Sequence, residues 1–227
     1  MKLLIVAATE LEISPLLQWL YKNWEPQRRA GSFKQGQLEL HCLITGLGSM
    51  HTAHALGQEL LLNPPDLAIN LGVAGALNPD LVLGQLYHVR AEILGDLGAE
   101  EKDGRLLDLF DLGLLAPSNP PYINKRLYNP QADESEFLPL ATGLTVNKAH
   151  GSAHSIEQIR AKYPEADLES MEGAAFFFAC LQAKQPFVAL RSISNYVEPR
   201  NRAAWQMEKA LDSLFEGAKS LLESLSK

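Results

Sequence analysis

The stretch Asp167-Leu-Glu-Ser-Met-Glu-Gly-Ala-Ala175 joins the end of a predicted strand to the start of a predicted helix. Leu168 and its neighbours are typical of a buried strand, and Gly173-Ala-Ala-Phe-Phe-Phe-Ala-Cys180 is typical of the first turns of a buried helix. Glu169 and Glu172 therefore fall at a strand-to-helix junction, where open α/β sheets bind their ligands. An acidic residue at this point also favours the positive end of a helix dipole, so this stretch alone leaves a purely structural role open.

Strands and helices alternate along the rest of the chain. Continuous apolar runs predict buried strands at residues 3–8, 38–44, 66–76, 86–93, 139–146 and 185–194. Helices are predicted from Ser14-Pro15, over residues 50–62, through Ile156 to Tyr163, and from Asn201, the predicted N-cap of a last helix with an apolar stripe. This alternation predicts a three-layer α/β/α domain around a central mixed, mostly parallel sheet.

Composition restricts the class of protein. At 227 residues and 46% hydrophobic composition, the chain is long enough to bury one full core, which predicts a single domain over residues 1–227. A formal net charge of −7 argues against nucleic acid or an anionic membrane surface as the main partner. No apolar run reaches bilayer-spanning length, and the run at residues 1–8 is too short for a secretory segment, so we expect a cytoplasmic protein.

The histidines do not form a recognisable metal site. His51 and His54, and likewise His150 and His154, stand at helical spacing, but no Cys or carboxylate completes a set of zinc ligands. We therefore expect neither a metal nor a cofactor.

Two glycine-containing turns follow predicted strands. Gly46-Leu-Gly-Ser49 and Gly72-Val-Ala-Gly75 let the backbone turn tightly and approach a ligand closely, and such a turn at a helix start can bind an anion or a sugar. Neither turn has the ending of a phosphate-binding P-loop or the full dinucleotide fingerprint. From about residue 95 to 136 the chain is rich in Gly, Pro, Asp and Asn with little periodicity, which predicts a functional loop or lid.

Four motifs in this order resemble the nucleoside phosphorylase/hydrolase family: Leu4-Ile-Val-Ala-Ala-Thr-Glu-Leu-Glu12, Asn70-Leu-Gly-Val-Ala-Gly75, Ser170-Met-Glu-Gly173 and Arg191-Ser-Ile-Ser-Asn195. Within this family they are similar to the nucleosidases that cleave methylthioadenosine and S-adenosylhomocysteine. Ser170-Met-Glu-Gly-Ala-Ala175 and Ser194-Asn-Tyr-Val-Glu-Pro-Arg-Asn-Arg202 look like the futalosine hydrolase branch. This resemblance implies hydrolysis of the N-ribosidic bond of futalosine in menaquinone biosynthesis, with a purine nucleoside as the small-molecule partner and a homodimer or higher homo-oligomer as the assembly.

The resemblance also implies roles for individual residues. Glu12 matches the carboxylate that activates the attacking water, and Glu172 matches the one that holds the ribose hydroxyls beside Met171. Asn195 stands where adenine-cleaving relatives carry Asp. The backbone of Ala74 and Gly75 corresponds to the part of the site near the sugar and base.

Two departures from the adenosine-type pattern are visible. Val73 stands where those nucleosidases have Ser, and Ala149-His150 stands where they carry an aromatic and an aliphatic residue beside the base. We therefore expect Ala149 and His150 to contact the base without inheriting a role from the family. Because the 5′ group of futalosine carries a benzoate, its pocket should hold a cation, for which the candidates are Arg200, Arg202, Arg126 and Lys148.

Cleavage of an N-ribosidic bond explains this choice of residues. The sugar develops oxocarbenium charge, which one carboxylate stabilises while another deprotonates water. An Asn amide at position 195 offers its NH₂ to O6 and its carbonyl to a protonated N7, which fits a 6-oxopurine, whereas adenine would place an amino group against that NH₂.

Three alternatives remain open from the sequence. A methylthioadenosine/S-adenosylhomocysteine nucleosidase would release adenine instead. A phosphorolytic enzyme is disfavoured because the glycine turns lack an obvious pair of arginines for phosphate. A nucleoside-binding protein without catalysis is disfavoured because Glu12, Glu172 and Asn195 are all kept.

Overall fold

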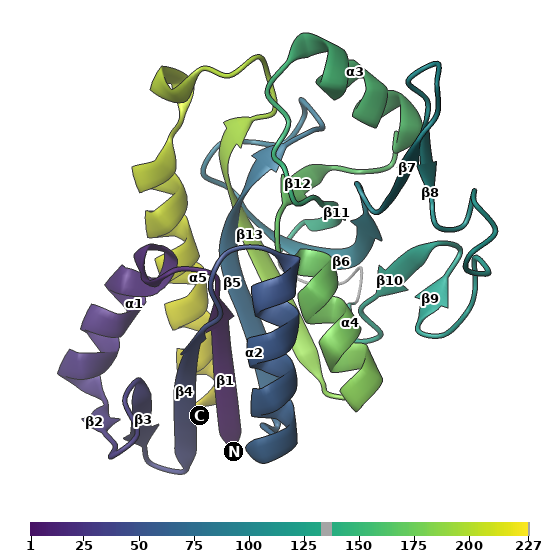
Figure 1. Cartoon of the computed structure of the whole chain (residues 1–227). Helices are drawn as coiled ribbons and strands as arrows, with labels where there is room; N and C mark the ends of the chain where they lie inside the picture. The colour runs from purple at the N-terminus through teal and green to yellow at the C-terminus, as the bar shows by residue number, and fades with distance from the viewer. Residues whose placement is uncertain (133–137, 227) are drawn as a thin grey trace.

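The computed structural model describes residues 1–132 and 138–226. One mixed sheet runs through the molecule in the order β2-β3-β4-β1-β5-β12-β11-β6-β10-β9, with β13 paired to both β5 and β6 (Figure 1). Its strands are β1 (Lys2–Ala7), β2 (Glu25–Pro26), β3 (Ser32–Gln35), β4 (Leu38–Ile44), β5 (Leu67–Ala76), β6 (Leu86–Leu94), β9 (Tyr122–Ile123), β10 (Arg126–Tyr128), β11 (Leu140–Thr145), β12 (Leu168–Ser170) and β13 (Phe187–Tyr196).

The ladders between the long strands are mainly parallel. β1 pairs in parallel with β4 and β5, β11 with β12 and β6, and β13 with β5, whereas β12 meets β5 and β13 meets β6 in antiparallel fashion. The strands β5, β12, β11, β6 and β13 therefore pair in a closed ring at one end of the sheet. The predicted mixed, mostly parallel sheet is confirmed, and the ring is a feature that periodicity did not predict.

Helices cover both faces of the sheet. α1 (Glu10–Asn23) and α5 (Met207–Leu225) lie on one face, α2 (Ser49–Leu62) and α4 (Gly173–Ala183) lie on the other, and α3 (Ala153–Lys162) packs beyond β11 and β12 (Figure 1). The three layers are therefore as predicted. None of the helices in the described residues is long and apolar enough to cross a membrane.

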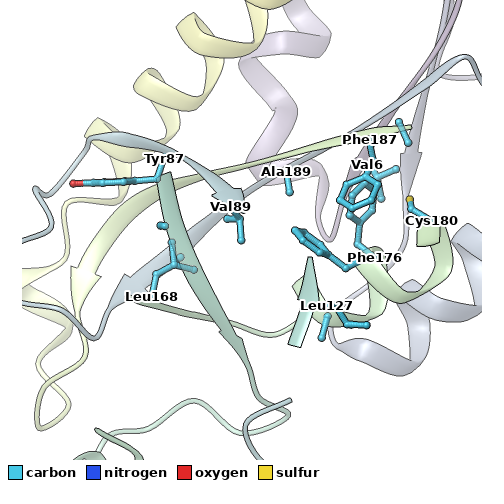
Figure 2. Close-up of a cluster of buried hydrophobic side chains, with 14 of the residues drawn as sticks. Val6, Tyr87, Val89, Leu127, Leu168, Phe176, Cys180, Phe187 and Ala189 are labelled. Carbon is cyan, nitrogen blue, oxygen red and sulfur yellow. The ribbon is translucent and has the colours of Figure 1, made fainter. Parts of the chain in front are cut away.

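Strand β1 shows why the sheet is buried on both sides. Leu3 and Ile5 pack with α1 and α5, while the intervening Leu4 and Val6 pack with α2 and α4. Successive side chains of a strand point to opposite faces, so an uninterrupted apolar run is needed to cover both. Figure 2 shows the second of these clusters, in which Val6 and Phe187 of the sheet lie beside Phe176 and Cys180 of α4.

Two helices begin at residues other than those predicted. α1 starts at Glu10 instead of Ser14, because the Glu12 carboxylate accepts a hydrogen bond of 2.9 Å from the backbone N–H of Thr9 and so closes the first turn four residues early. Pro15 consequently lies inside the helix. The last helix starts at Met207, and the predicted cap Asn201 instead precedes a short 3₁₀ turn at Arg202–Ala204.

The predicted irregular segment contains short strands. β7 (Gly98–Glu100) and β8 (Leu106–Asp108) form a separate hairpin, and β9 and β10 extend the main sheet beyond β6. Residues 133–136, the end of the predicted lid, lie outside the described residues.

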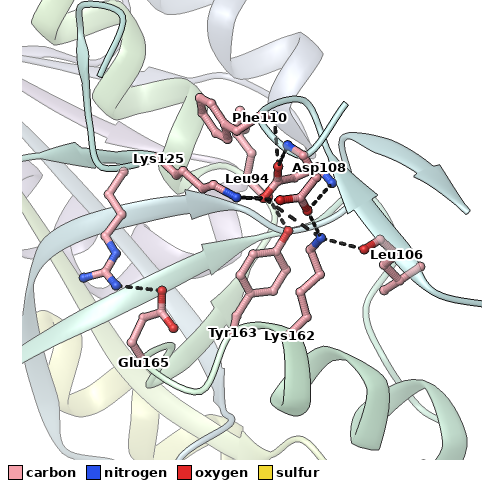
Figure 3. A network of polar contacts seen from close by, with 10 residues as sticks. Leu94, Leu106, Asp108, Phe110, Lys125, Lys162, Tyr163 and Glu165 are labelled. Atoms are coloured by element: carbon pink, nitrogen blue, oxygen red, sulfur yellow. Dashed lines mark hydrogen bonds and ion pairs between the residues drawn. The ribbon is translucent and has the colours of Figure 1, made fainter. Parts of the chain in front are cut away.

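An ionic network fixes this segment to α3 (Figure 3). Lys125 Nζ lies 2.6 Å from Asp111 Oδ1, and Lys162 Nζ lies 2.7 Å from Asp111 Oδ2. These two ammonium groups hold the pKa of Asp111 far below its usual range. Lys125 also donates to Asp108 at 3.2 Å within the segment, and Lys162 at the end of α3 donates to the carbonyl of Leu106 at 2.6 Å, so Lys162 joins the segment to α3.

A carboxyl group is buried beneath the start of α4. Glu92 on β6 is only 1% exposed, its Oε2 accepts a 2.8 Å hydrogen bond from Thr145 Oγ1, and that hydroxyl accepts one of 2.7 Å from the N–H of Ala174. Its Oε1 has no hydrogen-bond partner among the described residues. Burial raises the pKa of Glu92 from its ordinary value of 4.5 to about 7, although the nearby Arg191 opposes the rise.

The position of Glu92 predicts a steric requirement for glycine at the start of α4. A Cβ atom at Gly173 would lie 1.9 Å from Glu92 Oε1, whereas one at Gly57, on the exposed side of α2, would meet nothing within 4 Å. We expect Gly173→Ala to lower the free energy of unfolding by about 1–3 kcal/mol, as overpacking does. The matched Gly57→Ala should raise it by about 0.5–1 kcal/mol, because Gly is unfavourable inside a helix. Urea unfolding of both variants tests this, and equal effects would contradict it.

Glu92 should also make stability depend on pH. Between its unfolded pKa of about 4.5 and its folded pKa of about 7, the folded protein keeps a proton that the unfolded chain has lost, so this group contributes most stability below pH 4.5 and loses that contribution as pH rises to 7. Glu92→Gln removes the titration. The free energy of unfolding of the variant, relative to wild type, should rise by up to about 3 kcal/mol between about pH 5 and pH 8. A difference that is constant with pH would show that Glu92 ionises normally.

Candidate active site

A cavity of about 310 Å³ opens where β5, β12 and β13 meet the starts of α1 and α4. Of the predicted site residues, the cavity is lined by Glu12, Ala74, Gly75, Ala149, His150, Met171, Glu172, Asn195 and Arg200. Arg202 is not among its lining residues. Val73 and Glu169 also line it.

The turn before α1 holds the Glu12 carboxylate in place. Oε2 accepts hydrogen bonds from the backbone N–H of Thr9 at 2.9 Å and from the Thr9 hydroxyl at 3.1 Å. Oε1 accepts a hydrogen bond from the backbone N–H of Val73 at 3.3 Å. A Cβ atom at Gly72 would lie 3.0 Å from Oε1, so glycine gives the carboxylate its space against β5. These three hydrogen bonds hold the Glu12 carboxylate in place. A carboxylate has about four lone-pair sites, so one remains to accept a hydrogen bond from a water molecule.

Glu172 is bound by the first glycine turn. The N–H of Gly48 donates to Glu172 Oε1 at 2.7 Å across 124 residues of chain, and Ser49 Oγ donates to the carbonyl of Met171 at 3.1 Å. The turn that was predicted to approach an anion therefore binds a carboxylate of the protein itself. Burial raises the pKa of Glu172, the nearby Glu12 raises it further, and the Gly48 bond and Arg191 act in the opposite direction.

Arg191 is a buried cation near the site, and local sequence pattern did not predict its place there. It is 2% exposed, and its guanidinium donates to Asn70 Oδ1 at 2.5 Å and to the carbonyl of Leu190 at 3.0 Å. A Cβ atom at Gly72 would lie 3.5 Å from Arg191 Cζ and 3.0 Å from Glu12 Oε1, so this cation and the Glu12 carboxylate both border the space that glycine leaves free. An arginine inside the apolar strand 187–196 was the available signal, because such a charge needs partners when buried.

Gly75 lies between two polar side chains in one row across three strands. In the ladder it pairs with Glu169 of β12 on one side and with Asn195 of β13 on the other. A Cβ atom at Gly75 would lie 2.9 Å from Val197 Cγ2 and 3.3 Å from Asn195 Nδ2, so a side chain at this position would have to displace these neighbours. Asn195 belongs to β13 instead of following it, and a register shift between Ile193 and Asn195 marks the irregular end of the ladder.

Among the described residues, the Asn195 amide bonds only to its two chain neighbours. Its Oδ1 accepts a hydrogen bond of 2.9 Å from Ser194 Oγ, and its Nδ2 donates one of 2.9 Å to the carbonyl of Tyr196. Both amide atoms retain unused hydrogen-bonding capacity toward a ligand.

His150 and Glu169 form a close pair on the opposite side of the row. Glu169 Oε1 accepts a 3.0 Å hydrogen bond from the backbone N–H of His150, and Oε2 contacts Nδ1 of the His150 ring. The His150 side chain is 10% exposed and that of Glu169 is 6% exposed. The sequence had marked Glu169 only as a junction carboxylate and His150 only as a contact to the base.

The four candidate cations lie in different places. Arg200 lines the cavity, with its guanidinium carbon 6.0 Å from the ring centre of Trp205. Lys148 lines a neighbouring cavity of about 290 Å³ that shares His150. Arg126 forms an ion pair of 2.7 Å with Glu165, and Arg202 begins the exposed 3₁₀ turn.

Comparisons with known proteins agree with this architecture. The sequence profile of the Phosphorylase superfamily matches residues 2–225. The chain is 34% identical to the futalosine hydrolase of Streptomyces coelicolor over 70% of its own length, and spans just under two thirds (66%) of that protein. It is 32% identical to the futalosine hydrolase of Thermus thermophilus, covering 79% of this chain and 80% of the relative.

A solved structure shows the same fold. The 5′-methylthioadenosine/S-adenosylhomocysteine nucleosidase of Neisseria meningitidis, in complex with methylthio-immucillin-A, superposes with a TM-score of 0.75 at 20% identity over 98% of this chain and 99% of that one. The profile match over nearly the whole chain, together with relatives above 30% identity, shows the family. The chain belongs to the phosphorylase superfamily.

Proposed function

We propose that this protein hydrolyses the N-ribosidic bond of futalosine, releasing hypoxanthine and dehypoxanthine futalosine, as a step of menaquinone biosynthesis. The observation that carries the proposal is that Glu12, Glu172, Gly75 and Asn195 line one cavity. The identity of 32% to a curated futalosine hydrolase across four fifths of both chains supports this substrate over others of the family.

Glu12 acts on the attacking water, and Glu172 acts on the ribose. Glu12, fixed by the N–H groups of Thr9 and Val73, removes a proton from the water that attacks C1′. Glu172 binds the ribose hydroxyls, and its negative charge stabilises the oxocarbenium charge that develops on the sugar. Its oxygen bound to Gly48 is oriented by the protein, which leaves the other oxygen for the substrate.

Water, and not phosphate, is the proposed nucleophile. A phosphate ion needs cationic or N–H donors, and Arg200 is the sole Lys or Arg among the cavity-lining residues of the described chain. The N–H of Gly48, which would suit an anion, is already bonded to Glu172. We assign Arg200 instead to the benzoate carried by the 5′ group of futalosine, since it stands beside Trp205 at the cavity.

The assembly and location are also proposals. We propose a homodimer in the cytoplasm, with residues 95–136 acting as a lid of a single domain. Leu47 lines the cavity yet is 61% exposed, and Met50, three residues later, is 75% exposed, which supports a partner surface at the cavity edge. The hairpin β7-β8 lines the neighbouring cavity that shares His150, which supports a role near the site.

A substrate panel tests the activity. The purified protein should release hypoxanthine from futalosine at the same rate with and without phosphate, and it should form no ribose 1-phosphate product. Methylthioadenosine and S-adenosylhomocysteine, assayed in parallel, should be poorer substrates. Phosphate-dependent release would mean phosphorolysis, and a preference for methylthioadenosine would assign the chain to the adenine-releasing nucleosidases.

Removal of either carboxylate charge should strongly reduce turnover. We expect Glu12→Gln and Glu172→Gln each to lower kcat by at least about 10²-fold, because each variant keeps the side-chain shape but removes a base or a stabilising charge. Glu10→Gln, on the exposed side of the same helix start, is the matched control and should leave kcat unchanged. Near-normal turnover of Glu12→Gln would show that Glu12 does not activate the water.

Asn195 should determine which purine is accepted. Protonated Asp offers its hydroxyl to N7 and its carbonyl to a 6-amino group, so Asn195→Asp should shift preference from futalosine toward its 6-amino counterpart. A mispaired buried polar group costs about 1–3 kcal/mol, which corresponds to roughly a ten- to hundredfold change in the ratio of kcat/KM values. Asn201→Asp makes the same change elsewhere in the cavity lining and should not alter the ratio. An unchanged ratio in Asn195→Asp would show that Asn195 does not read the base.

A further inference from the structure

The departing base needs a proton that Asn195 cannot supply. When the C1′–N9 bond breaks, its electron pair moves to the purine, and protonation of a ring nitrogen lowers the cost of that charge. An amide carries no ionisable proton, so Asn195 can orient the base but cannot act as its acid. Glu12 is committed to the water in the proposed reaction, and Glu172 to the ribose.

The His150–Glu169 pair has the structure of an oriented acid. An ionised carboxylate only accepts hydrogen bonds, so the contact between Glu169 Oε2 and Nδ1 places a proton on Nδ1. The second bond, from the His150 N–H to Glu169 Oε1, fixes the backbone beneath the ring. No described residue bonds to Nε2 of His150, and the residue lines the cavity.

The strand register brings this pair to one edge of the proposed base site. Glu169 and Asn195 flank Gly75 in the same row, and paired residues of neighbouring strands share a face of the sheet. With strands about 4.8 Å apart, the two Cα positions are separated by roughly 10 Å. All of these residues line the same cavity, so a base bound there beside Gly75 has Asn195 on one side and His150 with Glu169 on the other.

We propose that His150 is the general acid that protonates the leaving base, and that Glu169 is a positioning residue that orients the imidazole. The inference rests on the proposed nucleosidase function. As C1′–N9 breaks, the Nε2 proton of protonated His150 passes to a ring nitrogen of the base, the water oxygen bonds to C1′, and a water proton passes to Glu12. Glu12 then releases its proton to solvent, and His150 regains one from solvent.

The decisive experiment compares two leaving groups. N7-methylation gives the purine a positive charge, so the base leaves as a neutral molecule without being protonated. On futalosine, His150→Gln and Glu169→Gln should each lower kcat/KM by about 10²-fold or more, in line with general acid catalysis. On N7-methylfutalosine, the kcat/KM of each variant should stay within about fivefold of wild type. Protonation of the leaving base, which the variants cannot perform, is not required for this substrate. His154→Gln, an exposed histidine on α3, is the matched control.

Each alternative outcome has a distinct meaning. Equal losses on both substrates would overturn the proposal and assign the pair a structural or binding role, and no loss on either would show that the pair is dispensable. If wild type does not accept the methylated substrate, imidazole rescue decides. His150→Ala should regain at least about tenfold activity on futalosine with added imidazole, and no recovery would overturn the proposal.

The experiment distinguishes a wrong substrate from a wrong role of His150. If wild type releases no base from futalosine, the proposed function fails by itself. The same comparison then uses the purine nucleoside that wild type does cleave and its N7-methyl derivative, and the same loss confined to the unmethylated substrate is expected.

Discussion

Arg191 is a cation buried inside the sheet, and its charge acts on two buried carboxyl groups beside it. Its guanidinium opposes the rise that burial causes in the pKa of Glu92 and of Glu172, and it borders the space beside Gly72 together with the Glu12 carboxylate. Carboxylates taken out of water are costly unless a cation or hydrogen bonds compensate them. A single buried arginine therefore offsets part of the cost of burying two carboxyl groups, one on β6 and one at the start of α4.

Much of the fold was predictable because it follows from local pattern. The run at residues 3–8 predicted β1, since a strand covered on both faces needs apolar residues at every position. Element boundaries were less predictable where a side chain acts on the backbone. The bond from Thr9 to Glu12 starts α1 ahead of Pro15, and Asn201 looked like a cap although the chain makes a 3₁₀ turn before α5 begins.

The site was only partly predictable, because several of its contacts join distant segments. Local pattern marked Glu172 and Gly48 as features of separate turns, but nothing in either turn indicated that they bond to each other across 124 residues. Likewise, the relation of Glu169 to Asn195 exists only through the register of both strands on Gly75. Arg191 was missed for the same reason: it follows the apolar run at residues 187–190, and its partner Asn70 comes from another strand.

The glycine at position 75 has an evolutionary consequence. Because Val197 and Asn195 occupy the space where a side chain would project, this position cannot acquire a new contact to a ligand without disturbing β13. Selection for a different heterocycle is thereby directed to the flanking positions, 169 with its partner 150 on one side and 195 on the other. In proteins that share this glycine, a change of substrate should therefore appear as substitutions at positions 169 and 150 together with position 195, while position 75 remains glycine.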